Sequence, residues 1–305
     1  MTIQELLESV RRIEVRTNRL VNDMMVGAYL SHFKGRGMDF EELREYIPGD
    51  EVRDIDWNVT YRMGRPFVKR YREERELALV LAMDISASSA FGSLRRSKRE
   101  FAAEIAGTLA ISAARSSDKV ALLLFSDQVE LFLPPRKGRR HILRLIREML
   151  AFEPKHRGTN IPAALAFLNH VLHRRSIVFL LTDFLHSSGT DTRPSATGRD
   201  PLQEIGLTNA RHDLVCVHLH DPRESVLPPA GLLTLEDAET GELLEIDSNR
   251  AVVREKFARI NADRLAELDR GFRRAGVDTL SFSTAEPFAQ TLQRFFETRR
   301  GRRRG

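Results

Sequence analysis

The residues with the clearest chemical meaning are an Asp-Ile-Ser-Ala-Ser run at positions 84–88, which places Asp84, Ser86 and Ser88 at alternate positions. The run directly follows an apolar stretch, residues 77–83. An apolar stretch ended by small polar residues predicts a buried parallel strand, and ligands bind at the carboxyl ends of such strands. One carboxylate and two hydroxyls are hard oxygen ligands, so this pattern favours a site for Mg²⁺ or Mn²⁺.

Two later segments supply more oxygen groups. Residues 157–160, Arg-Gly-Thr-Asn, form a glycine turn that opens a predicted helix and contains Thr159. A second apolar run, residues 176–182, is followed by Asp183. These groups are expected to converge at the strand ends. The predicted metal ligands are therefore Asp84, Ser86, Ser88, Thr159 and Asp183. The alternative is that the same residues only cap helices and form turns.

With these three elements in this order, the chain resembles the von Willebrand factor A fold and its metal-ion-dependent adhesion site. That site is written D-x-S-x-S, then Thr, then Asp. The resemblance implies that Ser86 and Ser88 bind Mg²⁺ or Mn²⁺ directly and that Thr159 binds directly or through water. It implies that Asp84 and Asp183 mainly hold coordinated waters.

The alternation of apolar runs with helical patterns from residue 77 onward predicts a largely parallel sheet with right-handed crossovers. We expect an α/β, von Willebrand A-like fold with six strands, an antiparallel edge strand and helices on both faces. An N-terminal helix and a small β-rich segment precede it. The expected parts are residues 1–76, residues 77–298 for the von Willebrand A-like domain, and a basic tail at 299–305.

A second resemblance lies upstream, at residues 45–57, which read Glu-Tyr-Ile-Pro-Gly-Asp-Glu-Val-Arg-Asp-Ile-Asp-Trp. This is similar to the Y-x-P-G-D-x-x-R-x-I-D-W signature of the bacterial domain-of-unknown-function-fifty-eight family, which places it before a von Willebrand A-like domain. Residues 40–44 and 68–70 also fit. Genes of that family often lie beside a MoxR-type AAA+ ATPase, so the resemblance implies such an ATPase as partner.

Within this segment, Asp50, Asp54 and Asp56 allow two interpretations. A carboxylate cluster would suit acid–base or metal chemistry. The acids, however, interleave with Arg53 and with apolar residues, which is typical of a structural corner whose ions are paired. We favour the structural or docking role.

Composition narrows the class of protein. The 305 residues are 42% hydrophobic and 30% charged, with a net charge of +5, which is an ordinary balance for a folded domain with a full core. The lone Cys216 excludes an internal disulfide or a cysteine zinc cluster. No apolar run is long enough to cross a bilayer, and acids stand where a signal peptide needs apolar residues, so a cytoplasmic location is expected.

The basic tail could touch nucleic acid, but a solvated terminus is the commoner explanation and no nucleic-acid partner is expected. Phosphate-binding and dinucleotide-binding glycine loops are missing from the sequence, so any energy source must come from a partner. The pairs His218 with His220 and His170 with His173 could each chelate a metal, but neither has an obvious third ligand nearby in sequence.

These observations favour a metal-dependent protein-interaction module rather than an enzyme. A divalent ion held mostly by neutral hydroxyls and water gains by taking a carboxylate from a protein client. The rival function is a metal-assisted phosphoester hydrolase, with the ion as Lewis acid. A long polar loop, residues 184–201, is expected to act as a partner-selecting lip beside the ion.

Overall fold

The computed structural model describes residues 8, 10–15, 38–73, 78–94, 96–185 and 200–302. The chain divides into two units, Phe33–Leu77 and a larger unit that combines Met1–His32 with Ala78–Gly305. The predicted first part, residues 1–76, is thus divided. The physical reason is that buried Ile13 packs over Gly107 of the larger unit, where an added Cβ would lie 2.9 Å from the Ile13 Cγ2.

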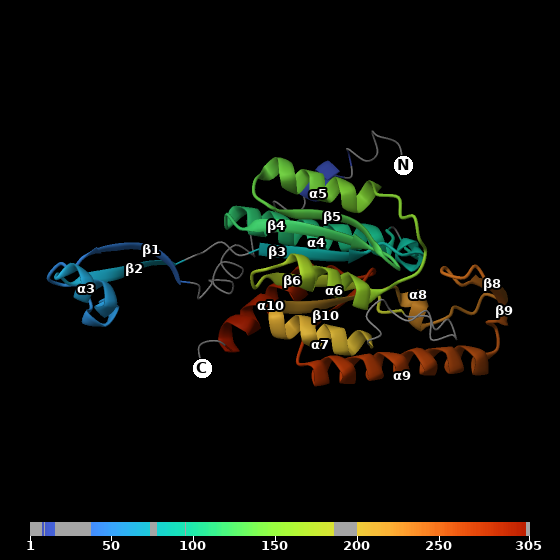
Figure 1. Ribbon diagram of the computed structural model, residues 1–305. Helices are drawn as coiled ribbons and strands as arrows, with labels where there is room; N and C mark the ends of the chain where they lie inside the picture. Colours follow the sequence, from blue (N-terminus) through green and yellow to red (C-terminus); the bar gives the residue numbers. More distant parts are fainter. Residues whose placement is uncertain are drawn as a thin grey trace. The chain divides into compact units, whose positions relative to one another are not determined.

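The larger unit is built on a six-stranded sheet with the strand order β10-β7-β6-β3-β4-β5 (Figure 1). Its strands are β3 (Ala78–Asp84), β4 (Lys119–Phe125), β5 (Val129–Arg136), β6 (Ile177–Thr182), β7 (Asp213–His220) and β10 (Asp278–Ser283). All neighbouring strands are parallel except β4 and β5, which pair antiparallel at one edge. The order is that of a doubly wound sheet, so the predicted von Willebrand A-like α/β fold is confirmed.

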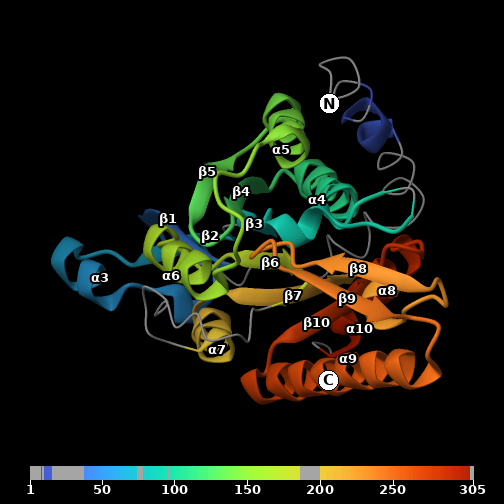
Figure 2. The same cartoon turned by 90° about the vertical axis from the view of Figure 1, so that its right-hand side faces the viewer.

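Helices cover both faces of the sheet (Figure 2). They are α4 (Lys98–Arg115), α5 (Arg139–Ala151), α6 (Ile161–Val171), α7 (Pro201–Arg211), α9 (Ala251–Ala275) and α10 (Ala289–Arg302). Side chains of α6, α7 and α9 share one core with Val80 and Leu123. On the other face, Phe101 of α4 contacts Phe282 of β10. Strands buried on both faces need continuous apolar runs, and for this reason the runs at residues 77–83 and 176–182 located β3 and β6 closely.

Helix α7 was not predicted, although its start carries standard signals. Asp200 accepts a hydrogen bond from the Leu202 N–H, and Pro201 occupies the first turn. The predicted lip, residues 184–201, is therefore wrong at its C-terminal end, and its residues 186–199 lie outside the described residues. At its start, residues 184–185 form a loop as predicted, but Phe184 belongs to the core, because it is only 5% exposed and its ring packs edge-on against Phe272.

The predicted basic tail begins too early. Arg299 lies inside α10, where its guanidinium contacts Asp213 at 2.5 Å and Asp278 at 2.6 Å. These two carboxylates come from β7 and β10, so Arg299 ties the last helix to the edge of the sheet. The arginine is needed for packing and does not belong to a solvated terminus.

Three smaller elements lie at the carboxyl edge of the sheet or beyond it. The turn after β3 contains the 3-10 helix η3 (Ala87–Ala90), and β7 is followed by the short α8 (Pro222–Ser225). Strands β8 (Leu232–Glu236) and β9 (Leu243–Asp247) form the predicted antiparallel hairpin as a separate two-stranded sheet. Among the helices that the structure describes, none combines the length and the apolar character required for crossing a membrane.

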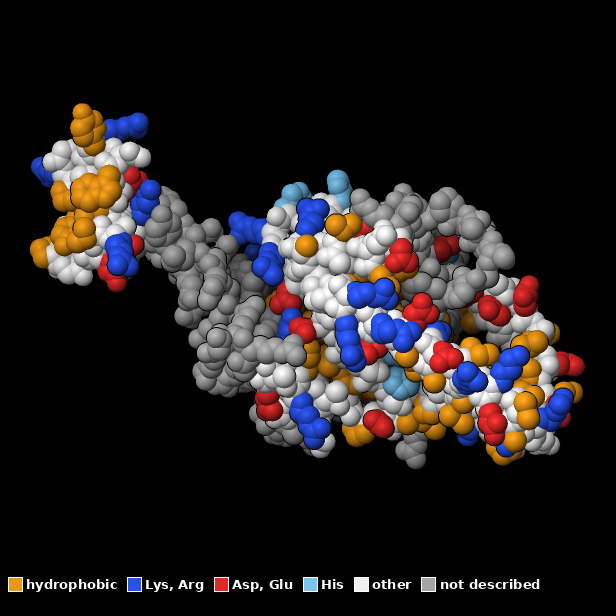
Figure 3. Space-filling view, turned by 90° about the horizontal axis from the view of Figure 1, so that it is seen from below, with side chains coloured by type: hydrophobic (Ala, Val, Ile, Leu, Met, Phe, Trp, Pro, Cys, Tyr) orange, Lys and Arg blue, Asp and Glu red, His pale blue; other side chains and the backbone are white. Residues whose placement is uncertain are grey.

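The smaller unit pairs β1 (Met38–Glu45) antiparallel with β2 (Phe67–Glu73) and adds η2 (Val52–Asp54) and α3 (Trp57–Met63). Helix α3 was not expected in this β-rich segment. Figure 3 shows hydrophobic side chains gathered on its surface. The exposed large ones of this unit are Leu43, Ile47, Val52, Trp57, Tyr61 and Met63.

Two of the three signature acids of this unit, Asp50 and Asp56, are paired locally. Asp50 accepts two hydrogen bonds from the Arg44 guanidinium, at 2.6 and 2.9 Å. Asp56 lies 2.9 Å from the Lys69 Nζ and caps α3 by accepting from the Asn58 and Val59 N–H groups. Each carboxylate thus serves a different cation, which supports the structural interpretation over a carboxylate cluster.

The first prediction concerns Ser97, which positions the start of α4. Its side chain accepts the Glu100 N–H at 3.2 Å while the Glu100 carboxylate accepts the Ser97 N–H at 2.9 Å. Ser97→Ala should lower the free energy of unfolding by about 1 kcal/mol in denaturant titrations, whereas Ser97→Asp, which can still cap, should cost far less. Equal losses in both variants would contradict the capping role.

Candidate functional site

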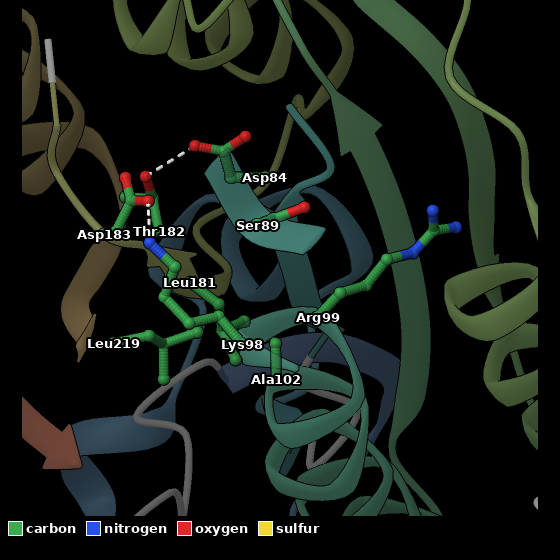
Figure 4. A pocket seen from close by; sticks show the side chains of 9 residues that line it. All are labelled: Asp84, Ser89, Lys98, Arg99, Ala102, Leu181, Thr182, Asp183 and Leu219. Carbon is green, nitrogen blue, oxygen red and sulfur yellow. Dashed lines mark hydrogen bonds and ion pairs between the residues drawn. The ribbon is translucent and has the colours of Figure 1, made fainter. Parts of the chain in front are cut away.

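Two aspartates meet where neighbouring strands of the sheet end. Asp84 is the last residue of β3 and is 4% exposed, while Asp183 directly follows β6 and is 5% exposed. The Thr182 hydroxyl donates to Asp84 Oδ2 at 2.6 Å (Figure 4), and the Ser86 N–H donates to Asp84 Oδ1 at 2.8 Å. The fold therefore buries both carboxylates at one edge and fixes Asp84 from both sides.

The two serines lie in the turn after β3. Their hydroxyl oxygens are 3.1 Å apart, and both residues are buried. The Ser89 hydroxyl donates to the Ser86 carbonyl at 2.7 Å, which holds the turn in shape. Two side-chain oxygens of the predicted set are thus already adjacent.

Thr159 reaches this edge from the loop before α6. The Ala87 N–H donates to the Arg157 carbonyl at 2.9 Å, which joins the serine turn to this loop. The Thr159 hydroxyl itself donates to Glu239 Oε1 at 3.2 Å, a carboxylate in the turn of the β8–β9 hairpin. The structure therefore brings Asp84, Ser86, Ser88 and Asp183 together directly and places Thr159 beside them through backbone contacts.

A buried lysine, Lys98, was not among the predicted site residues. Its ammonium donates to Asp183 Oδ2 at 2.5 Å (Figure 4). It also donates to Glu224 Oε1 at 2.5 Å, and the Lys98 side chain is 1% exposed. The sequence carried a signal for it, namely a cation at the start of an alanine-rich, otherwise buried helix. Glu224 carried one too, because it belongs to a capping box with Asp221 directly after β7.

The burial of these charges shifts their pKa values. Burial, and then the neighbouring Asp183, raises the pKa of Asp84 to about 7. Burial alone would favour the neutral amine of Lys98, but the carboxylates of Asp183 and Glu224 outweigh it and raise the pKa of Lys98. The cluster thus contains one firmly charged ammonium among three acids.

The histidine pair on β7 is accounted for without a metal. His218 and His220 stack at 5.3 Å, and the Ser281 hydroxyl lies 3.4 Å from the Nδ1 atom of each ring. Burial, followed by His220 and Arg264, lowers the pKa of His218 to about 3, so this ring is neutral. In the ranges that the structure describes, no three His, Cys, Asp or Glu side chains group as a metal site.

The hydroxyl pair fits a small divalent cation. Adjacent ligands around an octahedral Mg²⁺ with bonds of about 2.1 Å lie about 3 Å apart, and the Ser86 and Ser88 oxygens are 3.1 Å apart. The carboxylates behind them are already oriented by hydrogen bonds, since Asp183 Oδ1 also accepts the Leu185 N–H at 3.0 Å. This arrangement suits a cation whose direct ligands are the neutral hydroxyls and whose coordinated waters are held by the carboxylates.

A cavity of about 320 Å³ opens beside Ser88. Its walls come from the turn after β3, the segment after β6, α8 and the tip of the β8–β9 hairpin. The lining residues are Ser88, Phe91, Leu185, Glu224, Glu236, Asp237, Ala238 and Glu239. The space beside Ser88 is therefore bounded by several acids of the same chain.

Two mycobacterial proteins are similar to this chain, one over nearly its whole length and one over about half of it. An uncharacterized protein of Mycobacterium tuberculosis is 30% identical over 299 residues, which span 97% of this chain and 90% of that protein. An uncharacterized protein of Mycobacterium avium is 30% identical over 172 residues, which span 55% of this chain and 94% of that protein.

Solved structures with partial likeness include the conserved hypothetical protein BatB from Bacteroides thetaiotaomicron, at 14% identity and a TM-score of 0.45, covering 73% of this chain and 98% of that chain. An aerotolerance-related membrane protein from Bacteroides fragilis has 14% identity and a TM-score of 0.47, covering 74% of this chain and 99% of that chain. Residues 42–267 match the family described as "Protein of unknown function DUF58". The chain therefore belongs to the DUF58 family, as its signature segment indicated.

Proposed function

We propose that this chain is a divalent-metal-dependent protein-interaction module whose ion takes a carboxylate from a protein client. The observation that carries the proposal is the pair of serine hydroxyls, 3.1 Å apart at a strand end, with two buried carboxylates behind them. Ser86 and Ser88 would hold Mg²⁺ or Mn²⁺ directly. Thr159 would complete the set, and Asp84 with Asp183 would hold its waters.

The chemistry of the donors favours an acidic client. Lys98 already offsets part of the negative charge of Asp183 and Glu224. Neutral hydroxyl ligands leave the charge of a bound cation largely unquenched, so an added carboxylate gains a strong charge-assisted contact. The bound metal would supply this electrophilic point, and the residues of this chain would position it.

We also propose a MoxR-type AAA+ ATPase as the working partner. Membership of the DUF58 family supports this, together with the gene association that the family resemblance implies. The expected cytoplasmic location stays a prediction.

A hydrolase is less well supported by the geometry. A hydrolase needs a general base that takes the proton of an attacking water, and an imidazole is the most frequent one. His218, the neighbouring imidazole, is buried. An interaction site uses the same residues without needing a base.

The direct test is metal binding by calorimetry. Ser86→Ala/Ser88→Ala should weaken Mn²⁺ binding by on the order of 10- to 100-fold or more, because both proposed direct ligands are lost. Thr159→Val should weaken it and Thr159→Ser should not, since serine keeps the hydroxyl. Equal affinity in the wild type and the double variant would refute the metal site.

Lys98 offers a test of the charge balance. Lys98→Met removes the ammonium but keeps an apolar stem, which should cost about 3–5 kcal/mol of stability without metal by leaving buried carboxylates unpaired. A bound divalent cation would offset that excess negative charge, so Mg²⁺ should raise the melting temperature of Lys98→Met more than that of the wild type.

The matched control for that measurement is Arg99→Met. Arg99 follows Lys98 on the same helix, but its guanidinium donates to the Met149 and Phe152 carbonyls, away from the carboxylates (Figure 4). This variant should lose stability without a larger metal-induced shift. Equal metal-induced shifts in wild type and Lys98→Met would contradict a cation near Asp183.

Turnover assays separate the module from the rival hydrolase. Wild-type protein loaded with Mg²⁺ or Mn²⁺ should not cleave generic phosphoesters such as p-nitrophenyl phosphate above the rate of the metal in buffer. Metal-dependent turnover that Asp84→Ala abolishes would reverse the assignment in favour of a hydrolase.

A further inference from the structure

The β8–β9 hairpin reaches the candidate metal site from a distant part of the sequence. Glu239, in its turn, accepts the Thr159 hydroxyl at 3.2 Å. The cavity beside Ser88 is bounded on the hairpin side by Glu236, Asp237 and Glu239. A carboxylate of this chain therefore lies at the place where the proposed function puts the carboxylate of a client.

We propose, on the basis of the metal-dependent function above, that Glu239 is an internal carboxylate ligand for the ion. It occupies the client's position, and the hairpin keeps the site closed until a client's acidic residue displaces it. Glu239 is then a further metal-binding residue. It is also a competitor, so that only a client whose affinity is high enough to displace Glu239 from the ion can bind.

The turn is built so that Glu239 is presented in one orientation. The Asp237 side chain accepts the N–H groups of Glu239 and Thr240 at 2.9 and 2.8 Å. The Asp237 N–H donates to the Glu242 carbonyl at 2.8 Å, and Gly241 takes the left-handed backbone that closes the turn, with φ at 76°. The hydrogen bond from Thr240, ahead of the others, lowers the pKa of Asp237, so the carboxylate that orders the turn stays charged.

The hairpin is anchored at its base and has little apolar packing along its length. Ser248 is fully buried, and its hydroxyl bonds the Gly231 carbonyl at 2.8 Å. By contrast, Leu232, Leu243 and Leu244 are 68%, 68% and 61% exposed. Displacing the tip therefore uncovers little apolar surface and leaves the core intact, as a releasable contact requires.

Charge explains why an ion would strengthen the closed position. Glu239 shares its cavity with Glu224, Glu236 and Asp237, and like charges at such a site repel one another. A divalent cation held by Ser86, Ser88 and Thr159 reverses the sign of that interaction for the carboxylate nearest to it. Metal binding and closure of the hairpin are thus expected to be coupled.

The test uses the full chain with Mn²⁺ as the probe and compares Glu239→Gln with Glu242→Gln. Glu242 lies in the same turn and is exposed, and it does not line the cavity, so the control makes the same charge change away from the site. Glu239→Gln should weaken Mn²⁺ binding by about tenfold through loss of an anionic ligand. Water-proton relaxation should also show an additional exchangeable water on its bound Mn²⁺, while Glu242→Gln matches the wild type in both measurements.

A second measurement follows the competition itself. A short glutamate-containing peptide should bind the Mn²⁺-loaded Glu239→Gln variant about tenfold more tightly than the Mn²⁺-loaded wild type, since the internal competitor is gone. Wild-type Mn²⁺ binding with affinity and relaxation equal to those of Glu239→Gln would overturn this inference and leave the metal site standing. Failure of the wild type to bind Mn²⁺ at all would overturn both proposals.

Discussion

The carboxyl edge of the sheet depends on one buried ion cluster, in which the Lys98 ammonium lies between Asp183 and Glu224 at 2.5 Å from each. Asp183 and Asp84 lie close enough to interact electrostatically, and two buried carboxylates without a counter-charge would strongly favour unfolding or protonation. Lys98 supplies that charge from the first residue of α4. The cluster thereby fixes the start of α4, the end of β6 and the short helix α8 relative to one another.

The pairing of these buried charges also determines which oxygen groups beside the cluster are left for a cation. Because the acids are held by Lys98, Thr182 and backbone N–H groups, the side-chain oxygens left adjacent to each other at this edge of the sheet are the Ser86 and Ser88 hydroxyls. A site of this kind offers neutral oxygens to a cation and keeps its negative charge behind them. Because neutral oxygens leave most of a cation's charge unquenched, the proposed function needs a further carboxylate, either from a client or from Glu239.

The signature segment of the smaller unit uses its charges differently. Asp50 is clamped by Arg44, and Asp56 both caps α3 and pairs with Lys69. A motif that recurs across a family can thus encode local architecture, with Asp50 serving a turn and Asp56 a helix end. Its exposed apolar side chains include Trp57 at 65% and Tyr61 at 91%, and the ion pairs and the helix cap described for residues 38–73 do not explain them.

The sequence determined those features whose physical cause is local. Continuous apolar runs at residues 77–83 and 176–182 located β3 and β6 to within one residue at each end, because strands buried on both faces cannot tolerate polar residues. The positions of Asp84, Ser86, Ser88 and Asp183 directly after apolar runs also predicted that these residues are neighbours, because parallel strands end at a common edge of the sheet. The family follows from a contiguous motif in the same way.

Tertiary structure alone decided the rest, because the partners are far apart in the chain. Lys98 and Asp183 are separated by 85 positions, Thr159 and Glu239 by 80, and no periodicity links such pairs. The same holds for Arg299, which reads as part of a basic tail until the fold places Asp213 and Asp278 beside it. Polar contacts between distant segments depend on which strand ends and turns the topology brings together, and only the folded chain specifies that.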